Sequence, residues 1–165
     1  MVDYQLPEAI QELQRQINPA DLYVVENSKS GFSYGMETEP HVTVAPCLRN
    51  NVKLDNLKTF LQPLDEYRLE LTNLNVFENK LFDVLVCDMK KCEVLHSTNA
   101  EIADNYQLNT SFDKFNPHIT VAYLKKGKGR EYAKLKFPKS VAMEPKCFAF
   151  SHYEGDLKKK IEFIK

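Results

Sequence analysis

The sequence predicts an α+β fold with a mostly antiparallel sheet. Helix-like and strand-like segments are interspersed without a strict βαβ rhythm, and two strands are joined closely enough to form a hairpin. The composition, 43% apolar and 27% charged residues, is that of a soluble globular protein. A chain of 165 residues can bury roughly 70% of its unfolded surface, so one domain over residues 1–165 needs no disulfide or metal to fold.

Apolar periodicity and turn residues predict the individual elements. Leu6, Ile10, Leu13 and Ile17 recur at helical spacing, which predicts a helix that ends before Asn18-Pro19. In chain order we expect helix 7–17, strand 22–26, strand 41–47, helix 54–61, hairpin 67–88, helix 91–107, strand 118–124, strand 140–150 and a final strand at IEFI. The polar stretch 27–40 is long for a connection, which is typical of a lid or a binding loop.

Two features bear on location and redox state. No apolar run approaches the ~20 residues that span a bilayer, and the N-terminus has no basic region followed by an apolar stretch. We therefore expect a cytoplasmic protein that has no contact with a membrane. The cysteines show no CxxC pair and no histidine at zinc-finger spacing, which favours reduced, mostly buried thiols at Cys47, Cys87, Cys92 and Cys147.

Charge is distributed unevenly, although the net charge is only −1. Residues 125–139 carry seven Lys or Arg against one acidic residue, Glu131. Non-specific binding of a long duplex depends on many phosphate contacts, so this overall charge argues against such a partner. The segment is either a solvated loop or a local patch that attracts a short anionic ligand. Both alternatives stay open.

An internal repeat is the most informative feature of the chain. Residues 40–45 are PHVTVA and residues 117–122 are PHITVA, so the two copies differ by one β-branched residue. Each copy begins an apolar strand and contains one of the four histidines. Because residues i and i+2 of a strand share a face, His41 projects with Thr43, and His118 projects with Thr120.

The repeat fits acid–base chemistry at a phosphate. Strict alternation also puts Ala45 and Ala122 on the histidine face, where small side chains leave room for a ligand. Two imidazoles can supply a base and an acid near neutral pH, and threonine hydroxyls can donate hydrogen bonds to phosphate oxygens. A single His-x-Thr is usually an ordinary polar strand edge, but the second copy favours catalysis. No carboxylate cluster accompanies the motifs, so we expect no metal and no cofactor.

The two motifs, HVTV and HITV, resemble those of the two-histidine phosphoesterase superfamily, which includes bacterial 2′-5′ RNA ligases and cyclic phosphodiesterases. The resemblance covers most of the chain, and the flanks GMETEPHVTV and FNPHITVAYLKKGKG look like those of phage-encoded members. It implies a bilobal fold with pseudo-twofold symmetry, each lobe giving one His-x-Thr strand. It also implies metal-independent cleavage of RNA-type phosphodiesters by His41, Thr43, His118 and Thr120.

Further residues are candidates for contacts with the substrate. Phe32 and Tyr34 precede the first motif and could stack on a nucleobase, or could simply hold the loop in place. Strict alternation puts Tyr123 on the core face, although a twist at the strand end could bring it to the rim of the site. Lys125 begins the basic segment. The other two histidines, His96 and His152, have no threonine two positions later, so we expect them to be structural or solvent-facing.

Several functions compatible with these motifs compete. The leading prediction is a phosphodiesterase acting on a small cyclic or 2′-5′-linked oligonucleotide. One setting for it is a phage enzyme that destroys a cyclic nucleotide signal in the host cytoplasm. RNA end processing, by a 2′,3′-cyclic phosphodiesterase or ligase-like enzyme, is the alternative. The remaining alternatives are a non-catalytic module that binds RNA ends and a virion component. No protein partner is implied.

Overall fold

The computed structural model describes residues 1–25, 34–46, 48, 53–64, 68–106, 108, 114–154 and 157–163, without the side chains of 54, 151–154, 157–160 and 163. Among these residues, eight strands form one sheet in the order β6-β3-β4-β5-β2-β1-β7-β8, and every neighbouring pair whose register is given is antiparallel. The prediction of an α+β fold with an antiparallel sheet is confirmed.

The strands are β1 (Val2–Tyr4), β2 (His41–Val42), β3 (Leu69–Glu78), β4 (Phe82–Met89), β5 (His118–Lys125), β6 (Val141–Met143), β7 (Pro145–Glu154) and β8 (Leu157–Phe163). The helices are α1 (Glu8–Arg15), α2 (Leu54–Leu61), α3 (Glu93–Asn105) and the single turn α4 (Gly129–Tyr132), with 3₁₀ turns at Pro19–Asp21 and Gln62–Leu64. No helix in the part of the chain that the structure describes is both long and apolar enough to cross a membrane.

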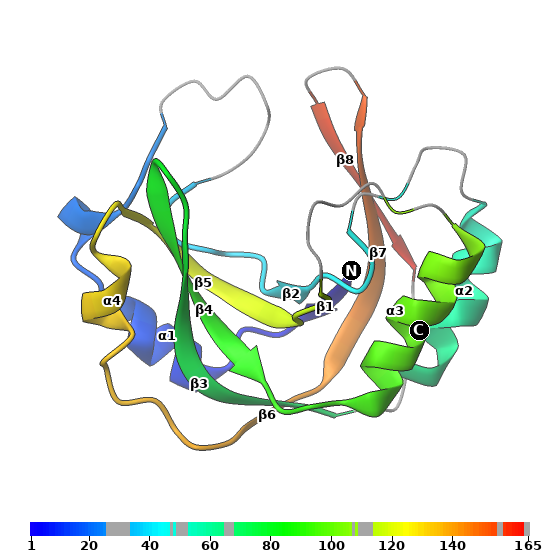
Figure 1. Ribbon diagram of the computed structural model, residues 1–165, viewed down its shortest axis with the longest axis horizontal. Helices are drawn as coiled ribbons and strands as arrows, with labels where there is room; N and C mark the ends of the chain where they lie inside the picture. The colour runs from blue at the N-terminus through cyan, green and yellow to red at the C-terminus, as the bar shows by residue number, and fades with distance from the viewer. Residues whose placement is uncertain are drawn as a thin grey trace.

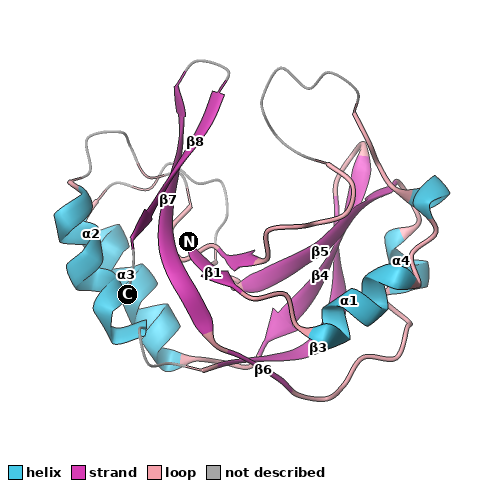
Figure 2. Ribbon diagram, turned by 180° about the vertical axis from the view of Figure 1, so that it is seen from behind, coloured by secondary structure: helices cyan, strands magenta, loops and turns pink. Residues whose placement is uncertain are grey.

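The sheet divides into two halves that meet at its two central strands. One half is β6-β3-β4-β5 and the other is β2-β1-β7-β8. The sheet curves so that the β3–β4 and β7–β8 hairpins rise on either side of β2 and β5 (Figure 1). Helices α1 and α4 lie at one end and α2 and α3 at the other, as the view from behind also shows (Figure 2). The second motif begins β5 at the edge of the first half, and the first motif begins β2 at the edge of the second half.

The core lies on one face of the sheet. Four adjacent strands, β4, β5, β2 and β1, each turn a side chain to this face that is at most 1% exposed: Cys87, Ile119, Val42 and Val2. Helix α1 covers it with Ile10 and Leu13, both buried, at the helical spacing seen in the sequence. The opposite face, the upper one in Figure 1, is therefore the face that carries the histidines.

Most predicted elements are confirmed with boundary shifts of a few residues, including helix 54–61, hairpin 67–88, helix 91–107 and strand 118–124. The predicted strand 22–26 is wrong where the structure describes it. Leu22 makes only an isolated bridge to Leu124, because the chain has just left the 3₁₀ turn at Pro19–Asp21. The predicted strand 41–47 shortens to His41–Val42, since the chain bends at 44–46 before Cys47, which lies outside the described residues.

One strand has no counterpart in the prediction, and one predicted strand is divided in two. β1 was not expected, and the predicted strand 140–150 is two strands, β6 and β7, separated at Glu144. The run Val2–Tyr4 is too short and too close to the chain start to show a strand periodicity by itself. It pairs because β2 and β7 flank it on both edges. Cys87, Cys92 and Cys147 are buried thiols, as expected, and burial raises the pKa of Cys87 to about 12.

A β-bulge in β5 changes which residues face the histidine side. Strand β4 pairs Val86 with Thr120 but Leu85 with Ala122, so Val121 is the extra residue. The carbonyl of Val121 accepts hydrogen bonds from the Glu37 backbone N–H and from Gln14 Nε2, each at 3.1 Å. The expectation for Ala122 is therefore wrong, because Ala122 turns into the core, where it is fully buried. Tyr123 turns to the face of His118 and Thr120, not to the core face that strict alternation gives.

The basic segment 125–139 begins with a turn held by one buried carboxylate. Asp83, 1% exposed, accepts hydrogen bonds from the backbone N–H groups of Gly127 (2.8 Å) and Gly129 (3.0 Å) and from Lys126 Nζ (2.9 Å). Gly127 has a positive φ of 87°, and a Cβ on Gly129 would lie 2.5 Å from Val76 Cγ1, so neither glycine is easily replaced.

Carboxylates also engage much of the segment's charge. Lys126 pairs with Asp83 and Glu78, Lys128 pairs with Asp21 and Glu131, and Arg130 pairs with Glu78. These pairs reduce the positive field that the segment can offer to a ligand. Lys125 takes part in none of the ion pairs found among the described residues. Lys134, Lys136 and Lys139 are also in none of these pairs, but they follow α4, whereas Lys125 ends β5, the strand of the second motif. The idea of a basic rim at the site therefore depends mainly on Lys125.

Asp83→Asn should destabilise the fold by about 2–4 kcal/mol, because it leaves buried N–H groups poorly paired and removes a buried carboxylate from its donors. Burial raises the pKa of Asp83, but the bonds from Lys126, Gly129 and Gly127 outweigh it and hold the pKa below its usual range. The stabilisation is thus present at neutral pH and is lost as pH falls through that lowered pKa. Urea unfolding from pH 3 to 7 measures it.

Glu78→Gln is the matched control, since Glu78 binds the same segment from an exposed position. It should change unfolding far less than Asp83→Asn does. Equal effects of the two substitutions would contradict the role given to Asp83.

Candidate active site

The two motifs lie side by side on the two central strands. β2 pairs antiparallel with β5 at Val42↔Ile119. In this register the neighbouring positions on the opposite face put His41 across from Thr120 and His118 across from Thr43. The histidines are thus diagonal neighbours, whose Cβ atoms lie roughly 7 Å apart in antiparallel geometry. His41, Thr43, His118 and Thr120 are all half-buried. The sequence prediction that the motifs project into a common space agrees with this placement.

Each imidazole is fixed in the same way by the residue two positions earlier. His41 Nδ1 lies 2.8 Å from the Glu39 carbonyl oxygen, and His118 Nδ1 lies 2.8 Å from the Asn116 carbonyl oxygen. A carbonyl can only accept, so each Nδ1 carries a proton and each Nε2 is left for a ligand. The intervening prolines, Pro40 and Pro117, are buried and restrict the backbone that presents these carbonyls.

A carboxylate stands next to each histidine on the far side from the other motif. Asp3 of β1 pairs with His41, and Asp88 of β4 pairs with His118. Cross-strand partners share a face, so both aspartates point to the histidine side. The order Asp3, His41, His118, Asp88 across four adjacent strands continues the twofold relation of the motifs.

The surroundings of the two histidines differ in detail. The ring of Phe77 meets His118 edge-on, with centroids 4.7 Å apart, and Asn75 Nδ2 donates to both carboxylate oxygens of Asp88 at 3.4 and 3.2 Å. Burial lowers the pKa of His118 and the Asn116 carbonyl raises it. His41 lowers it further and Asp88 raises it, with a net result below the usual value.

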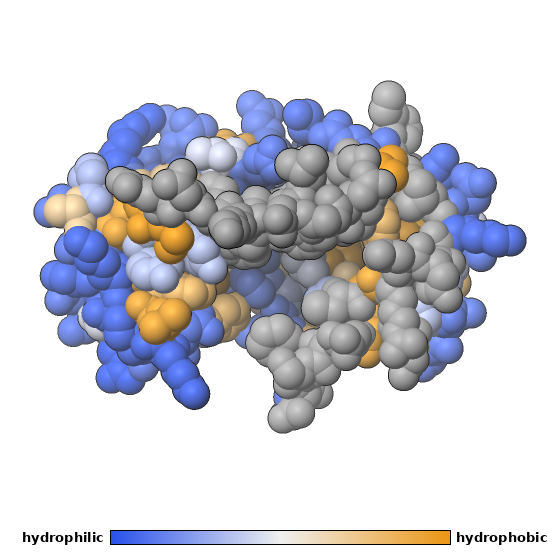
Figure 3. Space-filling model, turned by 90° about the horizontal axis from the view of Figure 1, so that it is seen from above, coloured by the Kyte–Doolittle hydropathy of each residue, from blue (hydrophilic) through white to orange (hydrophobic). Residues whose placement is uncertain are grey.

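The surface above this face is hollowed. Seen from above, the molecule has a depression near its middle, between the half with β3–β5 and the half with β7 and β8, and the visible floor is hydrophilic (Figure 3). This view looks down on the upper face of the sheet in Figure 1, the face opposite the core.

Of the predicted substrate contacts, the structure brings three to one end of this face. Tyr34 and Tyr123 pack edge-to-face with centroids 5.4 Å apart, and both contact Phe82, which pairs across the strands with Lys125. Tyr23 stacks on Phe82 at 5.0 Å. All four rings are half-buried, and they hold the segment at Tyr34 in place, the alternative that the sequence left open. Phe32 lies outside the described residues.

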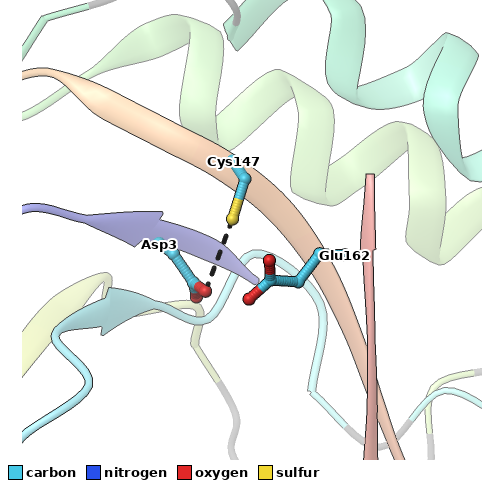
Figure 4. A group of neighbouring side chains, drawn as sticks. All are labelled: Asp3, Cys147 and Glu162. Carbon is cyan, nitrogen blue, oxygen red and sulfur yellow. Dashed lines mark hydrogen bonds between the residues drawn. The ribbon is translucent and has the colours of Figure 1, made fainter. Parts of the chain in front are cut away.

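A further cluster lies beside His41. Asp3 of β1, Cys147 of β7 and Glu162 of β8 bring their ligand-type atoms within 4.8 Å of one another (Figure 4). Cys147 Sγ lies 3.6 Å from Asp3 Oδ2 as a hydrogen-bond donor. Carboxylate and thiolate groups at this separation are of the kind that binds divalent cations. Sequence spacing could not show this group, because Asp3 is more than 140 positions away from both Cys147 and Glu162 along the chain.

Comparison with known families now adds to this geometry. The family model of the 2′-5′ RNA ligase superfamily matches residues 3–154, which include both motifs. The chain belongs to the 2′-5′ RNA ligase superfamily. A comparison with curated proteins gave no match. The superfamily is generally one of phosphoesterases, and membership supports an enzyme of that kind.

The superfamily motifs were visible in the sequence, but their supporting residues were not. Asp3, Asn75, Phe77 and Asp88 reach the site only through strand pairing, and no spacing in the sequence connects them with the histidines. Asp3 belongs to a strand that the sequence did not predict. The only available signal for Asp88 was its alternation with Val86 and Val84 on β4. His96, expected to be structural, packs against Phe115 with centroids 5.3 Å apart.

Both site histidines should be Nδ1–H tautomers when neutral, because each Nδ1 faces a carbonyl oxygen. Long-range ¹H–¹⁵N spectra of protein labelled in histidine, recorded well above the histidine pKa, distinguish the tautomers directly. His41→Ala and His118→Ala assign the two signals. A dominant Nε2–H form at either site would contradict the geometry.

Proposed function

We propose that this chain is a phosphodiesterase that cleaves RNA-type phosphodiester bonds with His41 and His118 as general acid and base. The observation that carries the proposal is the antiparallel pairing at Val42↔Ile119, which puts two His-x-Thr motifs on one face with both Nε2 atoms available. Superfamily membership supports the same class of reaction.

The proposed reaction needs only the groups that the motifs supply. One neutral imidazole takes the proton of a ribose hydroxyl as its oxygen attacks phosphorus. The other, protonated, imidazole gives its proton to the leaving oxygen as the P–O bond breaks. The hydroxyls of Thr43 and Thr120 donate hydrogen bonds to the non-bridging oxygens, where negative charge accumulates. No metal is required in this scheme.

The proposed substrate is a small cyclic or 2′-5′-linked oligonucleotide. The open depression over the sheet and the ion-paired basic segment favour a compact ligand with few phosphates over a long duplex. Destruction of a cyclic nucleotide signal by a phage-encoded enzyme is one biological setting for this reaction, and RNA end processing is the other. Turnover of a panel of cyclic dinucleotides, 2′-5′ oligoadenylate and 2′,3′-cyclic nucleotides separates them.

The aromatic end of the face supports a substrate longer than one nucleotide. Tyr123 lies five residues from His118 along β5, a separation of roughly 15 Å at strand rise. A base bound against Tyr34 and Tyr123 would therefore belong to a nucleotide beyond the one at the cleaved phosphate, with Lys125 near its phosphate. Aromatic side chains stack on unpaired bases of any sequence, which suits such a role.

His41→Ala and His118→Ala should each lower kcat by about 10²–10⁴, the contribution of one positioned acid or base. Thr43→Val and Thr120→Val should cost less, because each removes one neutral donor and leaves both proton transfers intact. Thr59→Val, at an exposed threonine of α2, is the matched control and should keep normal turnover. Assays in excess EDTA should give the same rates.

Near-normal turnover of either motif-histidine variant would exclude that residue as a catalyst. Loss of wild-type activity in EDTA, restored by added metal, would instead indicate that a cation is needed, and the group at Asp3, Cys147 and Glu162 would be the place to look. Binding of RNA ends without any turnover by the wild type would favour the non-catalytic module.

For a 3′-5′ linkage, a substrate with 2′-deoxyribose at the cleaved position should bind but resist cleavage. The neighbouring 2′-oxygen is the proposed nucleophile, and its removal leaves the phosphate and base contacts intact. The measurement compares single-turnover rates and Kd for matched ribose and deoxyribose substrates. Equal rates would show that water attacks directly.

A further inference from the structure

The two halves of the site differ in what surrounds each histidine. On the β5 side, Phe77 covers one edge of His118, and Asp88 is held by a neutral partner, Asn75. On the β2 side, Asp3 is part of a cluster with Cys147 and the exposed Glu162. The backbone carbonyl bonds to Nδ1 are equal in the two halves, so they do not distinguish the roles of the histidines.

We propose that His118 is the general base of the pair, that His41 is the general acid, and that Asp88, held by Asn75, is the positioning residue of the base. This inference rests on the proposed function and assigns the roles that the repeat leaves equivalent. It depends on the position of Asp88 opposite His118 in the β4–β5 register and on the contact with Phe77.

A base must be neutral before the reaction and must accept a charge during it. Phe77 and the burial of His118 exclude water from one side of the ring, which favours the neutral imidazole. When Nε2 takes the proton of the attacking hydroxyl, the ring becomes an imidazolium, and the nearby carboxylate of Asp88 stabilises that charge. The proton gained by His118 is matched by the proton that His41 Nε2 gives to the leaving oxygen, so the pair exchanges protonation states in each cleavage.

The charged and titratable neighbours of His118 are few. Among the described residues, His41 on β2 and Asp88 on β4 act on its charge, while β3 contributes the neutral Phe77 and Asn75. Asp88 and Phe77 have opposite effects on the protonation equilibrium of His118. Asp88 favours the protonated ring and raises the pKa of His118, whereas enclosure lowers it. We therefore expect substitutions at these two positions to shift the pKa of His118 in opposite directions.

The test is an NMR titration of the His118 imidazole in the wild type, Asp88→Asn and Phe77→Ala, paired with the pH dependence of kcat/KM for the same proteins. Asp88→Asn keeps the shape and can still accept from Asn75. It should shift both the His118 titration and the acid limb to lower pH by several tenths of a pH unit. Phe77→Ala should shift both to higher pH. Asp3→Asn, beside His41, should leave the His118 titration in place.

The assignment requires that the acid limb of the pH profile of kcat/KM moves together with the His118 titration. Movement of the alkaline limb with the His118 titration would make His118 the acid and overturn the proposal, as would an unchanged titration in Asp88→Asn. The titration needs no substrate, so it reports on Asp88 even if the proposed function fails. Absence of turnover on every substrate would count against the proposed function alone. Thermal unfolding of each variant confirms that the titrated protein is folded.

Discussion

The pairing of β2 with β5 is the constraint on which the site depends. A single described pair, Val42↔Ile119, joins the two halves of the sheet at its centre, and both residues are fully buried. Because alternation turns the flanking residues to the other face, the same pair that closes the core also brings His41 and His118 together. A shift of this register by one residue would turn the motif side chains of one half into the core and apolar residues into the depression.

Much of this could be predicted from the sequence. The duplicated PHVTVA and PHITVA segments identify the two strands and the face that His41 and His118 share, because strand alternation depends only on local geometry. The helices 54–61 and 91–107 were also predicted, because helical spacing is a local feature, and the second runs from Glu93 to Asn105 in the structure. Superfamily membership agrees with the motifs that led to the prediction.

The remainder depends on pairing that no local pattern reveals. Strict alternation put Tyr123 on the core face and Ala122 on the histidine face, and neither placement holds because a bulge at Val121 reverses the alternation beyond it. That bulge is held by Gln14 of α1, which is 107 residues away in the sequence. Asp3 and Asp88 likewise reach the histidines only through β1 and β4. The residues that distinguish one histidine from the other are therefore the ones that the sequence hides.

The central claim is that His41 and His118 act together on one phosphate. The most direct test compares kcat of His41→Ala, His118→Ala and the double variant on one substrate. Residues that work as a unit give strongly non-additive losses. The account predicts that the double variant is about as slow as the slower single variant. Losses that multiply would show two independent contributions and would contradict a shared acid–base pair.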